Sequence, residues 1–220
     1  MCDLGCGIGR WSSFLQSRVK ELVLVDFSEA VFVARRNLRS ADNVIFLMGD
    51  LQSLPLRKGF ADFVFCLGVL HHLPSDALSE VRNLKNYAPN LLVYLYSSLD
   101  GRPRHYRALL GLVTLLRRGT HRVRSRSARA VMSWIGVLTL YLPLIWIGRF
   151  LKPLGLSKAV PLYDFYHDKS VGRIRQDVYD RFFTRIEQRF SRDQILTLQD
   201  TFDTVTVSDK IPYWHFLCRA

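Results

Sequence analysis

Short runs of apolar residues alternate along the first hundred residues with segments whose apolar positions recur every three or four residues. The runs lie at positions 1–4, 22–25, 43–48, 60–67 and 90–97. Continuous apolar runs are typical of parallel strands covered on both faces, and the three-to-four-residue spacing is typical of the covering helices. The pattern predicts an α/β fold with a Rossmann-like, doubly wound and mostly parallel sheet.

Polar residues of this region gather where the predicted strands end. Asp3 stands near the end of the first run, Asp26 closes the second, Asp50 follows the third and Gly68 follows the fourth. Open parallel sheets bind their ligands beyond the carboxyl ends of the strands. We therefore expect these residues to share one rim of the sheet and to line one site.

The end of the chain predicts an antiparallel last strand. Ser191 and Gln194 have the spacing of a capping box, which predicts a helix through Thr201. Short apolar runs at 203–208 and 213–218 then predict a hairpin that completes the sheet.

The predicted elements divide the chain into three sections. Residues 1–99 form the core, 100–190 form a basic and apolar helical insertion, and 191–220 return to complete the core. The first strand is clipped at the N-terminus, because only Met1 to Leu4 precede the next motif and an interior strand usually has about five or six residues. We expect the upstream part of this strand to be missing.

A glycine loop follows the first strand directly. Gly5, Gly7 and Gly9 alternate within five positions, which lets the backbone turn tightly and approach a ligand closely. A dinucleotide loop needs G-x-G-x-x-G, but here the third glycine comes one residue early and Arg10 stands in its place. NAD is therefore disfavoured, and an ordinary tight turn is the alternative explanation for such a loop taken alone.

The order D-x-G-x-G-x-G at 3–9 resembles motif I of the class I S-adenosylmethionine (SAM) methyltransferases. Asp50 and Leu51, which follow Gly49, resemble the third motif of that family. The run G-V-L-H-H-L-P at 68–74 is typical of its small-molecule, type 11-like members. The resemblance covers about 1–97 and 191–220. The short first strand is a departure from the family pattern.

The resemblance implies SAM as the cofactor. The glycines would approach its methionine end, Asp26 would accept hydrogen bonds from the ribose, and Asp50 with Leu51 would meet the adenine. Asp3 would orient the loop and the amino group of the donor. The expected cofactor-binding residues are Asp3, Gly5, Cys6, Gly7, Gly9, Asp26, Phe27, Asp50, Leu51, Leu67 and Gly68, and no metal is expected.

Two adjacent histidines are the candidate catalytic residues. If the acceptor is a hydroxyl or phenol, a general base helps, and His71 or His72 stands at the end of the fourth strand with a suitable intrinsic pKa. Histidines at such a place also often only pack or bond the backbone. The sequence has no N-P-P-Y-type tetrapeptide after this strand, which weighs against methylation of amino groups of bases or glutamine amides.

The net charge of +12 belongs to one segment. Between Gly101 and Tyr163 there are twelve Lys or Arg and no acid, so the rest of the chain holds nineteen basic and nineteen acidic residues. The cysteines form no C-x-x-C pair and are expected to be reduced core residues in a cytoplasmic setting, not a disulfide or zinc framework. They are Cys2, Cys6, Cys66 and Cys218.

The insertion also carries a long apolar stretch. Seventeen residues from Val131 to Ile147 have no charge, but the stretch includes Pro143 and is shorter than the about 20 residues of a membrane span. Two readings remain: a helical lid whose arginines are merely solvated, and an interfacial helical pair whose arginines meet anionic headgroups. We expect a lid that docks on a membrane. The segment 163–187 mixes aromatic residues with acidic and basic ones. Such a mixture is typical of a charged surface helix, and it can also line an acceptor pocket.

The sequence thus predicts a SAM-dependent methyltransferase acting on a small, apolar or lipid-like acceptor. The expected localisation is cytoplasmic, with an anionic membrane surface as a candidate partner. An RNA methyltransferase or nucleic-acid binder is disfavoured because the arginines are mixed with long apolar runs. An inactive SAM-fold interaction module is the third candidate, and the sequence does not indicate an oligomeric state.

Overall fold

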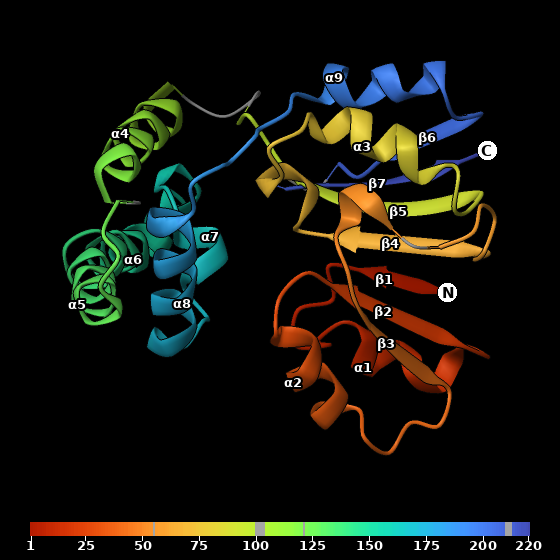
Figure 1. The fold of residues 1–220 in the computed structure, drawn as a ribbon. Helices are drawn as coiled ribbons and strands as arrows, with labels where there is room; N and C mark the ends of the chain where they lie inside the picture. Colours follow the sequence, from red (N-terminus) through yellow and green to blue (C-terminus); the bar gives the residue numbers. More distant parts are fainter. Residues whose placement is uncertain (55, 100–103, 121, 210–212) are drawn as a thin grey trace. The chain divides into compact units, whose positions relative to one another are not determined.

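The computed structural model describes residues 1–54, 56–99, 104–120, 122–209 and 213–220. The chain divides into two compact units (Figure 1). Unit 1 combines Met1–Asp100 with Ile186–Ala220, and unit 2 is Gly101–Arg185. Residue 100, where the predicted insertion begins, lies outside the described residues.

Unit 1 contains a seven-stranded sheet in the order β3-β2-β1-β4-β5-β7-β6. The strands β1 to β5 pair in parallel, whereas β7 is antiparallel to both β5 and β6. This confirms the predicted doubly wound, mostly parallel fold with an antiparallel last strand. The strands are β1 (Cys2–Leu4), β2 (Leu22–Asp26), β3 (Val44–Met48), β4 (Phe63–Leu67), β5 (Asn90–Tyr96), β6 (Thr204–Val207) and β7 (Tyr213–Arg219).

Each face of the sheet has its own hydrophobic core, because successive strand residues point to opposite faces. Leu22 and Leu24 of β2 pack with α2 (Ala30–Asn37), whereas the alternate residues Val23 and Val25 pack on the other face. The core on that second face includes the apolar sides of α3 (Ala77–Leu84) and α9 (Arg192–Leu196). The sheet is therefore sandwiched between helices, as its continuous apolar runs predict.

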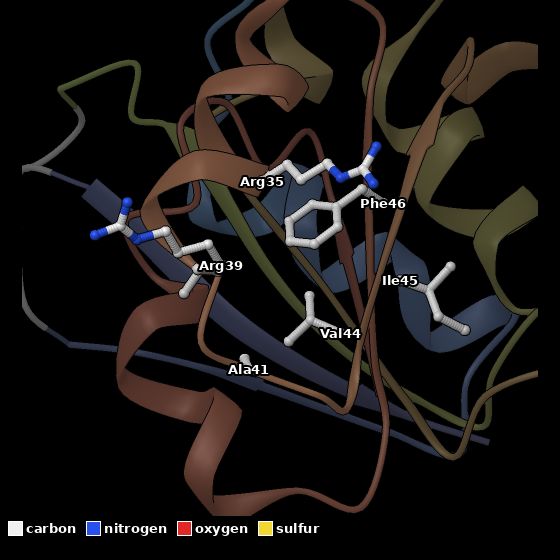
Figure 2. A pocket seen from close by; sticks show the side chains of 7 residues that line it. Arg35, Arg39, Ala41, Val44, Ile45 and Phe46 are labelled. Carbon is white, nitrogen blue, oxygen red and sulfur yellow. The ribbon is translucent and has the colours of Figure 1, made fainter.

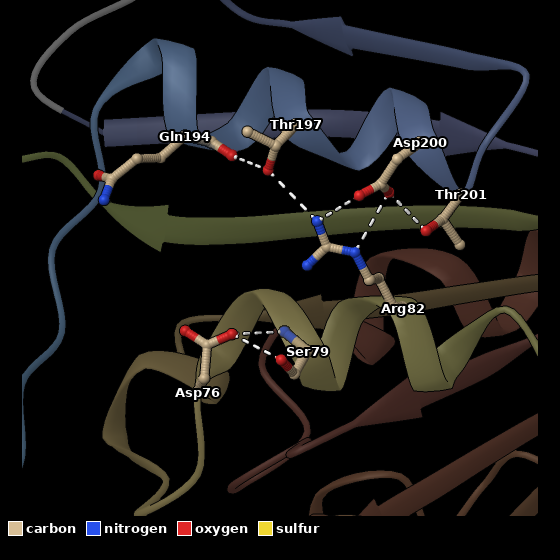
Figure 3. A network of polar contacts seen from close by, with 7 residues as sticks. All are labelled: Asp76, Ser79, Arg82, Gln194, Thr197, Asp200 and Thr201. Carbon is tan, nitrogen blue, oxygen red and sulfur yellow. Dashed lines mark hydrogen bonds and ion pairs between the residues drawn. The ribbon is translucent and has the colours of Figure 1, made fainter.

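A polar network joins α3 to the turn that follows α9 (Figure 3). Arg82 of α3 pairs with Asp200 at 2.9 Å and also donates to the hydroxyl of Thr197. The Ser191–Gln194 capping box is present, but α9 is α-helical only to Leu196 and continues as a 3₁₀ turn, Thr197–Asp200.

The starts of α3 and of the first helix lie beside polar contacts. Asp76 is the N-cap of α3, since its carboxylate accepts from the backbone N–H and the hydroxyl of Ser79 (Figure 3). The first helix, α1, covers only Ser12–Leu15 and leads into the 3₁₀ turn Gln16–Arg18. Trp11 and the Phe14 side chain are largely exposed, because the buried Ser12 faces inward to bond Asp3.

Unit 2 is helical. Its core is formed by Val137, Tyr141, Ile145, Tyr166, Ile174 and Val178. The helices are α4 (Arg104–Thr120), α5 (Arg126–Gly136), α6 (Leu142–Leu151), α7 (Tyr163–Tyr166) and α8 (Val171–Phe183).

One long helical run dominates unit 2. The π-helical turn Val137–Tyr141 joins α5 directly to α6, and a 3₁₀ turn extends the run to Leu154. Pro143 stands in the first turn of α6, where its missing N–H is tolerated after the wider π turn. The proline therefore does not end the helix, and Arg126–Leu154 is long and apolar enough to cross a membrane.

Candidate functional site

The acid that ends β2 contacts the glycine loop directly. The backbone N–H of Gly7 donates to Asp26 Oδ2 at 2.7 Å, and the N–H groups of Gly5 and Cys6 donate to the carbonyl of Val25. The loop that follows β1 is therefore held against the end of its neighbouring strand. Two residues that are 19 positions apart in sequence meet at the same rim.

The other oxygen of this carboxylate turns the chain into the next helix. Asp26 Oδ1 accepts from the backbone N–H of Ser28 at 2.8 Å and from its hydroxyl at 2.6 Å. The carbonyl of Asp26 also accepts from the N–H of Gly49 at 3.0 Å. That bond brings the end of β3, and with it Asp50, to the rim that holds the glycine loop.

Asp50 caps a short turn beside the site. Its Oδ1 accepts from the N–H of Gln52 at 2.9 Å at the start of the 3₁₀ turn Leu51–Ser53. Leu51 is buried in the core, whereas Asp50 is partly exposed. The acid is therefore accessible to a polar group of a ligand, whereas Leu51 belongs to the hydrophobic core beneath it.

Gly5 and Gly7 of the loop have different surroundings. Gly5 has φ +79°, and a Cβ there would lie 2.3 Å from a methyl group of Val69, so this glycine lets the loop pack on the turn after β4. Gly7 has φ +53°, but a Cβ there would meet nothing within 4 Å. The space above Gly7 is open, as a backbone cradle for a ligand requires.

Asp3 lies buried beneath the loop. Its side chain is only 2% exposed and accepts a hydrogen bond of 2.5 Å from the hydroxyl of Ser12. Burial raises the pKa of Asp3 to about 7, and the neighbouring Asp26 adds to the rise, whereas the bond from Ser12 opposes it. A ligand cation near this carboxylate would relieve the cost of ionising it.

The remaining predicted cofactor residues lie around this rim in different environments. The Cys6 thiol is buried and donates to the carbonyl of Gly7, and burial raises its pKa far above the usual range. Phe27 follows Asp26 and is 71% exposed. Leu67 ends β4 and is half-buried, and Gly68 follows it with φ +86°.

His71 and His72 differ in burial and in hydrogen bonding. His71 is fully buried, with its ring 3.9 Å from Tyr96 and 4.2 Å from His72 between centroids. Burial lowers the pKa of His71 to about 2, and the charges of His72 and Arg189 act in the same direction. His71 is therefore neutral at physiological pH, and its ring nitrogens do not reach solvent in this conformation.

His72 is partly exposed, and its Nδ1 lies 2.8 Å from the carbonyl oxygen of Ile186. A carbonyl only accepts, so the neutral ring carries its proton on Nδ1. In that tautomer Nε2 is the nitrogen that can take up a proton. Of the two candidates, His72 has the tautomer and the exposure that a base requires, and the catalytic assignment itself stays a prediction.

Gln188 is a structural residue that the sequence did not reveal. Its side-chain Nε2 donates to the carbonyls of Leu73 and Ser75, and its Oε1 accepts from the N–H of Ala77. Its backbone N–H donates to the carbonyl of His71 at 2.9 Å. Gln188 thereby ties the loop after β4 to the segment that re-enters unit 1, more than 110 residues later, and no local motif marks such a partner.

A shallow pocket lies elsewhere, beside α2 and β3 (Figure 2). Its volume is about 650 Å³, and it is lined by Arg35, Leu38, Arg39, Ala41, Val44, Ile45 and Phe46. The pocket reaches the amino end of β3, whereas Asp50 follows the carboxyl end. It is therefore separate from the rim that holds the predicted site.

Comparison with known proteins bears on unit 1. Residues 2–86 match the family model described as "Methyltransferase domain". No curated protein matches the chain at a significant level.

Several solved structures are similar to part of the chain. A SAM dependent methyltransferase from Aquifex aeolicus is 24% identical over 45% of this chain and 57% of its own, with a TM-score of 0.40. The PH0226 protein from Pyrococcus horikoshii OT3 is 28% identical over 44% of this chain and 48% of its own, with a TM-score of 0.40. Phosphoethanolamine N-methyltransferase 1 of Haemonchus contortus is 21% identical over 47% and 23%, with a TM-score of 0.42. The matched part spans about half the length of the first two structures.

Proposed function

We propose that residues 2–86, which match the model described as "Methyltransferase domain", form a class I SAM-dependent methyltransferase domain, and that this protein transfers a methyl group from SAM to a small, apolar or lipid-like acceptor. The observation that carries the proposal is the contact between Asp26 and the N–H of Gly7, on the rim that also holds Asp50. An acid on a neighbouring strand, joined to a glycine loop, is the arrangement that binds an adenosine ribose in α/β folds.

The residues at the rim fit the parts of SAM. The open space above Gly7 suits the methionine end of the cofactor, and the buried Asp3 suits its cationic amino group. Asp26 would hold the ribose, while Asp50 and Leu51 would hold the adenine. When bound, SAM supplies a methyl group already activated on a sulfonium. The protein then has mainly to position the acceptor, and positioning alone can contribute about 7–11 kcal/mol.

Aromatic rings at the ends of β4 and β5 support an apolar acceptor. Tyr94 and Tyr96 lie close to the two histidines, and Tyr94 also stacks on His215 with centroids 4.6 Å apart. Arg189 lies over the Tyr96 ring, 5.3 Å from its centroid, and pairs with Glu187 at 2.7 Å, which compensates its charge. Such a wall favours an acceptor without a formal charge, and a hydroxyl on it could deliver its proton to His72.

SAM binding is the decisive measurement. Calorimetry should detect binding by the wild type, and Asp26→Asn should lose affinity because it replaces a charged acceptor by a neutral amide. Asp62→Asn, which changes an exposed acid before β4, is the matched control. Wild-type protein that binds no SAM would contradict the proposal and favour the inactive interaction module.

Turnover tests the acceptor class. Formation of S-adenosylhomocysteine should rise when the enzyme is given neutral lipid-like phenols or alcohols, and not when it is given RNA. Stimulation by RNA alone would favour the RNA methyltransferase instead. We place the reaction in the cytoplasm, since all four cysteines are free thiols in the core.

A further inference from the structure

Unit 2 exposes apolar side chains along its longest helical run. Trp146, Ile147, Phe150 and Leu154 follow one another at helical spacing on α6 and its 3₁₀ extension, and Phe150 is 80% exposed. Leu138 extends the exposed surface towards α5. This exposed surface, which we call the apolar face, is distinct from the opposite side of the run, where Val137, Tyr141 and Ile145 are buried in the core of unit 2.

Exposed basic side chains occur in the same unit as this face. Arg118, Arg122, Arg124 and Arg126 are exposed at the end of α4 and the start of α5, and the sequence contains no acid from position 101 to 163. On α4 the exposed Leu115 stands three residues before Arg118, so leucine and arginine share one side of the helix. Exposed apolar groups and uncompensated cations therefore occur together.

We infer that unit 2 docks on an anionic phospholipid surface, with the apolar face of Arg126–Leu154 lying in the interface and the arginines meeting the headgroups. Aromatic and aliphatic side chains gain by entering the acyl boundary, and each nearby Lys or Arg adds to the attraction for anionic lipid. The inference is independent of the methyl-transfer reaction, because it rests on unit 2 alone.

The packing of α8 argues for a helix that lies in the surface and does not cross it. The helical run is 29 residues, or about 43 Å, so its length alone would allow a span. However, a Cβ at Gly136 would lie 2.9 Å from a methyl group of Val178, so α8 packs closely against the run. The helix α8 carries the Arg173–Asp177 ion pair and Asp180, which would have to enter the hydrocarbon with it.

Lipid fits this surface better than nucleic acid. A nucleic-acid surface pairs basic groups with aromatic platforms for the bases, and aliphatic side chains cannot stack on them. Leu115, Leu138, Ile147 and Leu154 are exposed in the same unit as the arginines and gain nothing from phosphates. Their burial requires an apolar medium next to a negative charge, which an anionic membrane provides.

Vesicle flotation at physiological salt tests the inference with the full chain. The protein should float with mixed phosphatidylcholine–phosphatidylglycerol vesicles and much less with pure phosphatidylcholine. The triple variant Arg118→Gln, Arg122→Gln, Arg124→Gln should lower partitioning by roughly tenfold or more. Its matched control is Arg35→Gln, Arg36→Gln, Arg39→Gln, which removes the same charge from exposed residues of unit 1 and should change little.

A second pair of variants tests the contribution of the exposed aromatic side chains to membrane binding. Trp146→Ala with Phe150→Ala should lower partitioning by roughly tenfold, whereas Phe14→Ala with Phe32→Ala, two exposed aromatics of unit 1, should not. Brominated lipid should quench the fluorescence of the wild type, and Trp146→Phe should remove part of that quenching. Circular dichroism of each variant checks that unit 2 remains folded.

Three results would overturn the inference. The first is equal flotation with neutral and anionic vesicles. The second is tight RNA binding that depends on the arginines but not on Trp146 or Phe150, which would assign the surface to nucleic acid. The third is retention in the membrane after alkaline carbonate extraction, which would indicate a spanning helix.

Discussion

Replacing Asp3 by Asn should stabilise the free protein while it weakens SAM binding. The Asp3 carboxyl is 2% exposed, and its pKa is raised from 3.8 to about 7, chiefly by burial. The folded state therefore resists ionising a group that the unfolded chain ionises readily. Asparagine has nearly the same shape, can still accept the bond from Ser12, and carries no charge.

The sign and size of the effect follow from linkage. About one pH unit or more below 3.8 the carboxyl is protonated in both states, so it causes no penalty. As the pH rises towards 7, only the unfolded state loses the proton, and the free energy of unfolding of the wild type falls. A difference of about three pKa units between the two states corresponds to about 4 kcal/mol above pH 7.

Urea unfolding of the wild type and the Asp3→Asn variant between pH 4 and pH 8.5 measures this difference. The stability gap should be smallest at the acid end, should grow through the middle of the range and should level off above about pH 7. The exposed control Asp62→Asn should show no such growth. A gap between wild type and Asp3→Asn that stays constant across the range would refute the reasoning.

SAM binding provides the second half of the test. If the amino group of SAM meets Asp3, binding favours the ionised carboxylate, so wild-type affinity should rise as the pH increases through about 7 and a proton should be released. Asp3→Asn should bind weakly at every pH. Undiminished binding by this variant would place the amino group elsewhere.

Three further changes separate folding from function. Gly7→Ala should cost only about 1 kcal/mol, from the strain of an alanine at φ +53°, and should abolish SAM binding in calorimetry. Gly5→Ala should cost at least roughly 2 kcal/mol, because its Cβ would also collide with Val69; equal destabilisation by both would contradict the open cradle. Gln188→Ala should cost about 2–4 kcal/mol in urea unfolding, since it leaves two partly buried carbonyls and an N–H without their partners. A loss below about 0.5 kcal/mol would show that these hydrogen bonds are dispensable. At pH 5 the free energy of unfolding of the wild type is lowered by about 2 kcal/mol, because the unfolded histidine binds a proton near pH 6.5 and the buried ring, with a pKa of about 2, does not. His71→Leu should remove this loss. A variant with the same acid sensitivity as the wild type would argue against the buried neutral ring.

The sequence by itself determined the sheet and the rim of the site. Its apolar runs locate the strands, and the acids and glycines at their ends must meet because the strands are parallel, as Asp26 and Gly7 do. The capping box at Ser191 and Gln194 is equally local. These features depend on short spacings and on the two faces of a strand, which a sequence records directly.

Tertiary structure alone decided the environment of each group. Adjacent histidines have the same chemistry in the sequence, yet His71 is buried against Tyr96 while His72 is partly exposed and bonds a carbonyl from the returning segment. The neighbours Trp11 and Ser12 likewise differ, since Trp11 is largely exposed whereas Ser12 is buried and donates to Asp3. Burial, pKa and accessibility depend on contacts between residues that are distant along the chain, and spacing does not encode those contacts.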